Sequence, residues 1–520
     1  DQKTDPQVKA ACRTALQRIA KVSGRSTEGK DAAVLFYELA EQYYYDRGSL
    51  QADPREDISN VWYWRQGRLV NVEVPRAVFN EIMAMRCCEE ALRLRPEYPE
   101  AIALWLAANF RREAQLGVAS VDSQDRDPAL EKDRTKPADF PRAIYFALAA
   151  GARYNQMVLA RGLRDSDPAV VLGAVSALAA TAGAGDLVGP EDIKQPLVET
   201  LSFPDVLIRV RAALALGMAL PTKPFAGCQK VVPVLAEALS LTGKKHALVI
   251  EPDQQNLNRI MAVLREAGFE VVGEASLLSG LNRARQQFPF VDVIFLASDI
   301  DQPQVGQAVA ELRKDLAFAA TPVVILAKPQ QTLIARRLAL ADERIDRVLA
   351  EAGKEGLLAA WRRVSRTAGR AELTDALALE LAMQAAEALR LIAVSGSQVY
   401  EFSKAVPALI AALQHPDLSL RQRAASVLAL SSLPAAQQAI ARLALSAETP
   451  QPLRIAAFGY LASSARAHGC MLTEPQVDQL IETVMGPENL AIRTASSQAL
   501  GALNLPGNKA SQMIRRQYRG

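Results

Sequence analysis

The residues best placed to do chemistry are acidic side chains that follow short apolar runs in the middle of the chain. Glu251 and Asp253 follow the apolar run at 247–250. Asp299 comes shortly after a second run at 291–296. Where such runs form parallel strands, their carboxyl ends meet at one edge of a sheet, which is where open α/β sheets bind ligands. Any chemistry of these residues would therefore take place at this edge.

Other catalytic and metal-binding sets cannot be assembled from the sequence. The three histidines, His246, His415 and His468, are scattered, and only His468 has a cysteine close by, at Cys470. One such pair is far short of a zinc site. A Cys/His or Ser/His catalytic set and a phosphate-binding glycine loop are both missing. We therefore expect no enzymatic activity, no cofactor, no metal and no small-molecule substrate.

The segment 244–368 alternates short apolar runs with amphipathic stretches such as 257–267. Its strand candidates are 247–250, 270–272, 291–296, 322–326 and 347–349. Short, fully apolar strands separated by helices predict a doubly wound parallel sheet.

In order and spacing this segment resembles the receiver domain of two-component response regulators, a flavodoxin-like fold of five strands. The resemblance implies an acidic pair that holds Mg²⁺, an aspartate that accepts phosphate, a Thr or Ser after the fourth strand and a lysine after the fifth. On this sequence the acidic pocket keeps Glu251 and Asp253. The phosphoacceptor position falls on Ala297, the hydroxyl position on Ala327 and the lysine position on Glu351.

The acceptor, hydroxyl and lysine positions are thus lost together. A carboxylate at Glu351 would repel an aspartyl-phosphate instead of pairing with it. Asp299 lies two residues beyond the acceptor position, so its side chain is expected to point elsewhere. We interpret the segment as a pseudo-receiver that is not phosphorylated. The alternative is a gap in the alignment that moves Asp299 into the pocket.

A repeated two-helix pattern surrounds this segment. Its clearest copies share an arginine, two small residues and a leucine: Arg209 with Ala212, Ala213 and Leu216; Arg421 with Ala424, Ala425 and Leu428; Arg493 with Ser496, Ser497 and Leu500. Small residues at helical spacing let neighbouring helices approach closely. An Asp/Pro turn followed by such a helix resembles the HEAT-repeat family, over about 155–240 and 375–505. The resemblance implies a stacked α-solenoid.

The pattern also shows where the repeats are interrupted. The stretch 233–239 has the character of the first helix of a pair, but its partner does not follow. A matching second helix comes only at 379–392. We therefore predict that 244–368 is inserted between the two helices of one repeat.

The amino-terminal part has a different character. The stretch 91–105 resembles the junction of two tetratricopeptide repeats, and 32–45 is an earlier helix. Between them, Trp62, Tyr63 and Trp64 lead into 68–74, which alternates like a short hairpin. Aromatic residues in such a loop suit a partner-binding site. The alternative is that they hold the loop against the helices.

The expected fold is mainly α, an α-solenoid of tetratricopeptide-like and HEAT repeats with an inserted α/β flavodoxin-like domain. The predicted parts are a tetratricopeptide-like domain at 1–115, a polar linker or loop at 116–142, HEAT repeats at 143–243, the receiver-like insert at 244–368, further HEAT repeats at 369–505 and a basic tail at 506–520.

Composition agrees with a large helical protein. The chain has 520 residues, of which 50% are hydrophobic and 22% charged. No apolar run reaches the roughly 20 residues needed to span a bilayer. The formal net charge of +3 is too small to predict a polyanionic partner. Basic clusters at 362–366 and in the tail are interpreted as solvated helix faces, with nucleic-acid binding as the alternative.

These observations favour a non-catalytic bacterial scaffold that binds other protein subunits or itself and organises a larger complex. One alternative is a signalling adaptor whose receiver responds to a ligand or to phosphate. A second is a HEAT-repeat nucleic-acid binder. The chain opens at Asp1 without methionine, as after removal of a signal peptide. We therefore expect a periplasmic or otherwise extracytoplasmic location, with the cytoplasm as the alternative.

Overall fold

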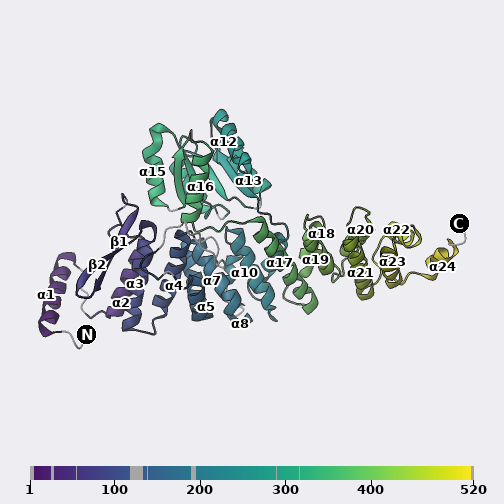
Figure 1. Cartoon of the computed structure of the whole chain (residues 1–520), viewed down its shortest axis with the longest axis horizontal. Helices are drawn as coiled ribbons and strands as arrows, with labels where there is room; N and C mark the ends of the chain where they lie inside the picture. Colours follow the sequence, from purple (N-terminus) through teal and green to yellow (C-terminus); the bar gives the residue numbers. More distant parts are fainter. Residues whose placement is uncertain are drawn as a thin grey trace. The chain divides into compact units, whose positions relative to one another are not determined.

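The computed structural model describes residues 5–24, 29–53, 55–117, 133–137, 139–188, 195–288, 290–315, 317–342 and 344–516. These residues are mainly helical, with one two-stranded and one five-stranded sheet (Figure 1). The chain divides into two compact units, one within 1–116 and 126–143 and the other within 117–125 and 144–520. In the described part of the chain, no helix combines the length and the apolar character needed to cross a lipid bilayer. The prediction of a mainly helical chain with a small parallel sheet is confirmed.

The first unit is a small group of helices with a β-hairpin. Its elements are α1 (Pro6–Ser23), α2 (Ala32–Tyr44), β1 (Ile58–Arg65), β2 (Arg68–Pro75), η1 (Arg76–Val78), α3 (Phe79–Leu94) and α4 (Pro99–Gln115). Helices α2, α3 and α4 pack on one another. One face of the hairpin, with Val61 and Val74, packs against Ile82 of α3. The three aromatic residues at 62–64 therefore lie in strand β1, and their placement in a loop was wrong.

The polar segment predicted at 116–142 is only partly described, since 118–132 and residue 138 lie outside the described residues. Its described end is not simply a surface loop. Asp133 is buried and pairs with Arg112 of α4 at 2.7 Å, and Arg142 is buried and pairs with Glu113 at 2.9 Å. Buried charges need such partners, so α4 supplies them. Part of the predicted basic tail, Gly507–Arg516, forms a helix.

The second unit contains a long series of helices. They are α5 (Ala143–Ala150), α6 (Ala152–Asp165), α7 (Pro168–Thr181), α8 (Ala184–Val188), α9 (Pro196–Thr200), α10 (Val206–Ala219), η2 (Cys228–Lys230), α11 (Val231–Ala238), α17 (Asp375–Ser395), η4 (Phe402–Ala405), α18 (Val406–Ala412), α19 (Leu418–Leu428), α20 (Pro434–Leu445), α21 (Gln451–His468), α22 (Glu474–Met485), α23 (Leu490–Ala502) and α24 (Gly507–Arg516). Pairs such as α18 with α19 and α20 with α21 pack together. Helices α7, α10, α17, α19, α21 and α23 also pack each against the next.

The repeated arginine has a structural role in the turn before four of these helices, α10, α19, α21 and α23. In α19, Asp417 caps the helix by accepting a hydrogen bond from the Leu420 backbone N–H at 2.9 Å. Four residues later, Arg421 Nε donates to the carbonyl of Leu413, at the end of the preceding helix, at 2.8 Å. The cap and the arginine thus satisfy backbone groups that helix ends leave unpaired. The same back-reaching bond is made by Arg209 to Phe203, Arg454 to Ala444 and Arg493 to Val484.

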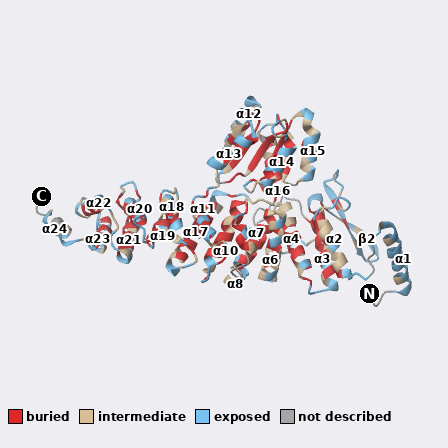
Figure 2. Cartoon of the chain, turned by 180° about the vertical axis from the view of Figure 1, so that it is seen from behind, coloured by how far each residue is buried: buried red, intermediate tan, exposed pale blue. Residues whose placement is uncertain are grey.

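An α/β domain lies between α11 and α17 in the sequence. Its strands are β3 (Lys245–Ile250), β4 (Phe269–Glu274), β5 (Val293–Ala297), β6 (Val323–Ala327) and β7 (Ile345–Leu349). They form a parallel sheet in the order β4-β3-β5-β6-β7. The surrounding helices are α12 (Gln254–Glu266), α13 (Leu277–Gln287), α14 (Val305–Lys314), α15 (Thr332–Ala341) and α16 (Lys354–Thr367), with η3 (Pro329–Gln331) before α15. Helices α12 and α16 cover one face, and α13, α14 and α15 cover the other, so the three central strands β3, β5 and β6 are buried (Figure 2).

The helices continue across this inserted domain. Helix α17 packs on both α10 and α11, although the whole domain separates it from α11 in sequence. The two connections meet where Gly243 N donates to Asp375 Oδ1 at 2.9 Å, across 132 positions of sequence. Gly217 of α10 lies at the centre of this contact, and a Cβ atom there would stand 3.1 Å from Leu235 and 3.6 Å from Ala388. Its lack of a side chain allows the three helices to approach closely.

Candidate functional site

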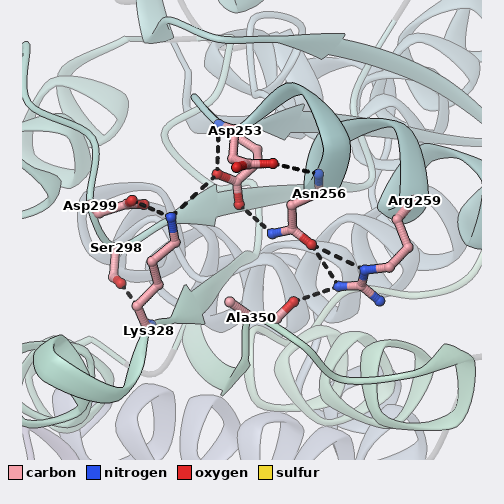
Figure 3. A network of polar contacts seen from close by, with 8 residues as sticks. Asp253, Asn256, Arg259, Ser298, Asp299, Lys328 and Ala350 are labelled. Atoms are coloured by element: carbon pink, nitrogen blue, oxygen red, sulfur yellow. Dashed lines mark hydrogen bonds and ion pairs between the residues drawn. The ribbon is translucent and has the colours of Figure 1, made fainter.

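The carboxyl edge of the parallel sheet gathers the acidic residues that the sequence analysis singled out. Strand β3 ends at Ile250, β5 at Ala297 and β6 at Ala327, and a charged or polar residue follows each of them. Adjacent parallel strands bring these residues to one edge. Figure 3 shows the resulting network of polar contacts.

Glu251 is the innermost charged group of this edge, with 0% of its surface exposed. Its Oε1 accepts a hydrogen bond from the Asp253 backbone N–H at 3.1 Å. Its Oε2 accepts one from Asn256 Nδ2 at 2.6 Å. The Nζ atom of Lys328 lies 3.9 Å from Oε1. A buried carboxylate requires such partners, and Glu251 receives them from three residues.

Asp253, the second member of the predicted acidic pair, serves a different purpose. Its Oδ1 accepts a hydrogen bond from the Asn256 backbone N–H at 2.7 Å and so caps the amino terminus of α12. Capping by aspartate satisfies an otherwise unpaired N–H and places a negative charge at the positive end of the helix. Glu251 and Asp253 are thus neighbours at this edge, but the side chain of Glu251 binds Asp253 N and Asn256 Nδ2, whereas that of Asp253 binds Asn256 N.

Asp299 faces Lys328, and the expectation that its side chain would point elsewhere was wrong. Its Oδ2 forms an ion pair with Lys328 Nζ, and the two side chains point toward one another in Figure 3. The hydrogen bond that Lys328 donates to Asp299 raises the pKa of Lys328. The loop after β5 therefore returns the side chain of Asp299 to the edge, two residues beyond the end of the strand.

Lys328 is held in place through its backbone. Its N–H donates to the hydroxyl of Ser298 at 3.0 Å, and Ser298 is only 2% exposed. Strands β5 and β6 are neighbours, so the residues that follow them are fixed side by side. The lysine side chain consequently starts from a rigid point between the two carboxylates.

The remaining predicted positions carry no reactive group at this edge. Ala297 and Ala327 end their strands buried, with 0% and 2% exposure, and a methyl group can neither accept nor position a phosphate. Glu351 is exposed in the turn after β7. Arg259 of α12 reaches the carbonyls on either side of it, donating to Ala350 O at 2.5 Å and to Ala352 O at 2.8 Å.

Sequence reasoning missed Lys328, Ser298, Asn256 and Arg259. Lys328 follows the apolar run 322–326 almost directly, so a lysine behind that strand was visible in the sequence. The resemblance places the lysine after the fifth strand, whereas in this chain it follows the fourth. The bonds of Asn256 and Arg259 depend on the turn of α12, which no pattern in the sequence indicates.

The opposite edge of the sheet carries a second group of charges. Arg370, in the connection to α17, pairs through Nε with Asp205 Oδ2 at 2.9 Å, and these side chains are 9% and 6% exposed. It also donates to the carbonyl of Val291 at 3.0 Å, just before β5. Asp205 is the N-cap of α10. One arginine therefore joins the helical series to the amino edge of the sheet.

Two titratable groups adjoin this joint. Burial raises the pKa of Asp292 to about 6, against the opposing effect of Arg370. The Asp292 carboxylate accepts a hydrogen bond from the His246 backbone N–H at 2.7 Å. Burial lowers the pKa of His246, whose ring lies against Phe288 and Phe290. Both groups are thus stabilised in their neutral forms.

The aromatic residues of β1 divide between two faces of the hairpin. Trp62 and Trp64 are 52% and 74% exposed, on the face that turns away from α3. Tyr63 points to the other face, where the guanidinium of Arg86 lies 4.4 Å from its ring centroid. Successive side chains of a strand alternate between faces, so the three residues cannot form one patch. Only the two tryptophans remain available for a partner.

No protein-family model matches this sequence, and no curated protein matches it. Among the described residues, no group of three or more His, Cys, Asp and Glu side chains is placed to hold a metal ion. The geometry of the two sheet edges and of the helices therefore carries the functional argument.

Proposed function

We propose that this chain is a non-catalytic scaffold that binds other protein subunits, or further copies of itself, through stacked helical repeats and an inserted pseudo-receiver domain. The observation that carries the proposal is the continuity of helix packing across the insertion, where α17 packs on α10 and α11. The series of helices is thus continuous on both sides of the inserted domain, which leaves the surface of that domain available to a partner.

The packing order of the helices supports an α-solenoid. The helices α7, α10, α17, α19, α21 and α23 pack each against the next, and in four of them, α10, α19, α21 and α23, an arginine reaches back to a carbonyl that precedes the helix. Stacked repeats of this kind present long surfaces whose shape is set before a partner arrives. Binding to such a surface loses little conformational freedom. In the first unit, the close packing of Ala91, Tyr98 and Ala101 between α3 and α4 supports a tetratricopeptide-like junction.

The strand order and the filled carboxyl edge support a pseudo-receiver. Counted within the domain, the order is 2-1-3-4-5, which flavodoxin-like folds share. Alanine stands at the acceptor and hydroxyl positions, and both oxygens of Glu251 and the Oδ2 atom of Asp299 already have partners. A domain of this kind is better explained by its surface than by phosphoryl chemistry.

The joint at Arg370 supports a fixed orientation of this domain. Its buried ion pair with Asp205 and its bond to Val291 tie the domain to α10, in addition to the two chain connections. A domain held at three points suits a docking surface better than a mobile switch.

The scaffold proposal is tested by mild affinity purification of the full chain from its own cells, with sizing of the complex and mass spectrometry of its components. We expect a partner, or further copies of the chain, in fixed stoichiometry. A double substitution of Trp62 and Trp64 to alanine should weaken the complex if the hairpin contributes, because exposed tryptophans are frequent binding hot spots. Leu278→Ala, at an exposed leucine of α13, is the matched control. A chain that remains monomeric and free of partners contradicts the proposal.

A second candidate function is a signalling adaptor with a responsive receiver, and one observation favours it. Asp299 lies at the carboxyl edge beside Lys328, which are the two residue types that phosphoacceptor chemistry requires. The test is incubation of the full chain with acetyl phosphate and Mg²⁺, followed by intact mass measurement, with Asp299→Asn as control. The scaffold proposal predicts no gain in mass. Addition of one phosphoryl group that Asp299→Asn abolishes would favour the adaptor.

A further inference from the structure

The receiver resemblance implies a Mg²⁺ ion at the carboxyl edge, but the side chains there do not fit one. Mg²⁺ requires near-octahedral oxygen ligands at about 2.0–2.1 Å. The carboxylate of Asp253 is engaged as a helix cap, and Ala297 offers no side-chain oxygen. A positively charged ammonium already lies beside the two carboxylates that remain, Glu251 and Asp299.

We infer that Lys328 is a built-in cation that takes the place of a divalent metal ion at this edge. Its ammonium holds together the loops after β3 and β5 by pairing with one carboxylate from each. The loops after β3 and β5 consequently stay together without a metal ion. This inference deepens the proposed function, since it rests on the domain being receiver-like.

The charges at the edge support the replacement of a metal ion by Lys328. Glu251 and Asp299 together carry two negative charges, and Lys328 compensates one of them. Hydrogen bonds from Asp253 N and Asn256 Nδ2 stabilise the remaining charge on Glu251. Without the ammonium, two carboxylates from different loops would face each other uncompensated. A divalent cation is then the simplest species that restores their balance, because Mg²⁺ commonly binds through one or two carboxylates and several waters.

The position of Lys328 is also set before any ligand arrives. Its backbone is fixed by the hydrogen bond to buried Ser298, and the side chain has 32% of its surface exposed. The backbone from which the side chain reaches both loops is therefore fixed, and the two ion pairs order the ammonium itself. A free metal ion would have to displace it and would meet its repulsion.

The experiment compares the full-length wild type with Lys328→Met and Lys328→Arg. Methionine keeps the unbranched chain without the charge, and arginine keeps the charge. Hydrogen exchange is measured for the backbone amides of Glu251, 253–256 and 298–299, with and without Mg²⁺ at constant ionic strength. These amides report local opening of the edge, independently of global unfolding.

We expect wild type and Lys328→Arg to exchange at the same rate with and without Mg²⁺. Lys328→Met should exchange about tenfold faster, which corresponds to about 1.4 kcal/mol of local opening. Saturating Mg²⁺ should restore most of this protection, and the added substitution Asp299→Asn should abolish the restoration. The inference would be overturned if Lys328→Met exchanged at the wild-type rate and this rate did not change with Mg²⁺.

Wild type alone provides a second test if Lys328→Met does not fold. Mn²⁺ is titrated into wild type and into Glu251→Gln, and bound Mn²⁺ is followed by its electron paramagnetic resonance signal. We expect the two proteins to bind the same amount, because wild type has no Mn²⁺ site that depends on Glu251. Such a site would also overturn the inference. If the inference about Lys328 is wrong, the scaffold proposal still stands, because that proposal depends on partners and on the absence of phosphorylation. Conversely, phosphorylation of Asp299 would defeat the scaffold proposal without deciding whether Lys328 replaces a metal.

Discussion

The two edges of the five-stranded sheet hold similar ion pairs in different surroundings. At the carboxyl edge, the side chains of Lys328 and Asp299 are 32% and 30% exposed. At the amino edge, those of Arg370 and Asp205 are 9% and 6% exposed. The first pair lies where ligands of α/β sheets bind, and the second lies where the domain meets the helices.

This difference in exposure separates two kinds of contribution. Water competes with a partly exposed pair, so its net effect on stability is small. A buried pair cannot lose one member without leaving the other charge uncompensated. The amino edge therefore determines where the domain is held, and the carboxyl edge retains side chains that can change partners at low cost.

The largest expected effect is that of Arg370→Met at the amino edge. It leaves Asp205 buried without its partner, and we expect the free energy of unfolding to fall by about 3–5 kcal/mol. Urea denaturation gives the total effect, and limited proteolysis near 369–375 shows whether the domain has come loose. Arg363→Met is the control, since that arginine is 56% exposed in its pair with Asp346 and should cost below about 1 kcal/mol. Equal losses for the two variants would remove the distinction between the edges.

The next effect is the pH dependence contributed by Asp292. Its pKa is raised to about 6 in the folded protein, so the folded state binds more protons than the unfolded state between the ordinary aspartate pKa and about 6. Stability from this group is therefore fully present at low pH and is lost as pH rises through about 6. Asp292→Asn cannot ionise, and at about pH 8 it should be more stable than wild type by about 1–3 kcal/mol.

The measurement is urea denaturation of wild type and Asp292→Asn at about pH 5 and about pH 8. The difference between the two proteins isolates Asp292, because His246 titrates in both. The advantage of the variant should be larger at about pH 8 than at about pH 5, because the loss in wild type builds up between the ordinary aspartate pKa and about 6. A difference that does not change with pH would show that Asp292 is ionised throughout.

Sequence reasoning placed the strands well because short apolar runs between helices leave few alternatives. The run 322–326 and strand β6 differ by one residue at each end, for example. It placed the site less well, because side-chain direction in a loop is not encoded in periodicity. Asp299 was expected to point elsewhere, yet its loop turns it toward Lys328. The aromatic residues at 62–64 were assigned to a loop. They form a strand only by pairing with β2, and this pairing is not visible in the sequence of 58–65 itself.

A smaller effect is expected for Ser298→Ala at the carboxyl edge. The buried hydroxyl accepts the Lys328 N–H, and its loss leaves that donor without an acceptor, which costs about 1–2 kcal/mol. Urea denaturation measures the cost, and hydrogen exchange of the Lys328 amide locates it. Ser279→Ala, at an exposed hydroxyl that bonds Ser276, should change stability by below about 0.5 kcal/mol. If both variants behave alike, the backbone bond does not fix Lys328.

The smallest effect is expected for Asp299→Asn, which removes the partly exposed pair itself. We expect a loss of about 0.5–1 kcal/mol at low salt, because water replaces much of the lost interaction. The loss should shrink toward zero at about 1 M salt, where charges are screened beyond about 3 Å. Asp346→Asn, which removes the exposed pair with Arg363, is the matched control and should follow the same salt dependence. A loss as large as that of Arg370→Met, insensitive to salt, would mean that the carboxyl edge is itself a structural joint, and the search for a binding surface would then move to the helices and the hairpin.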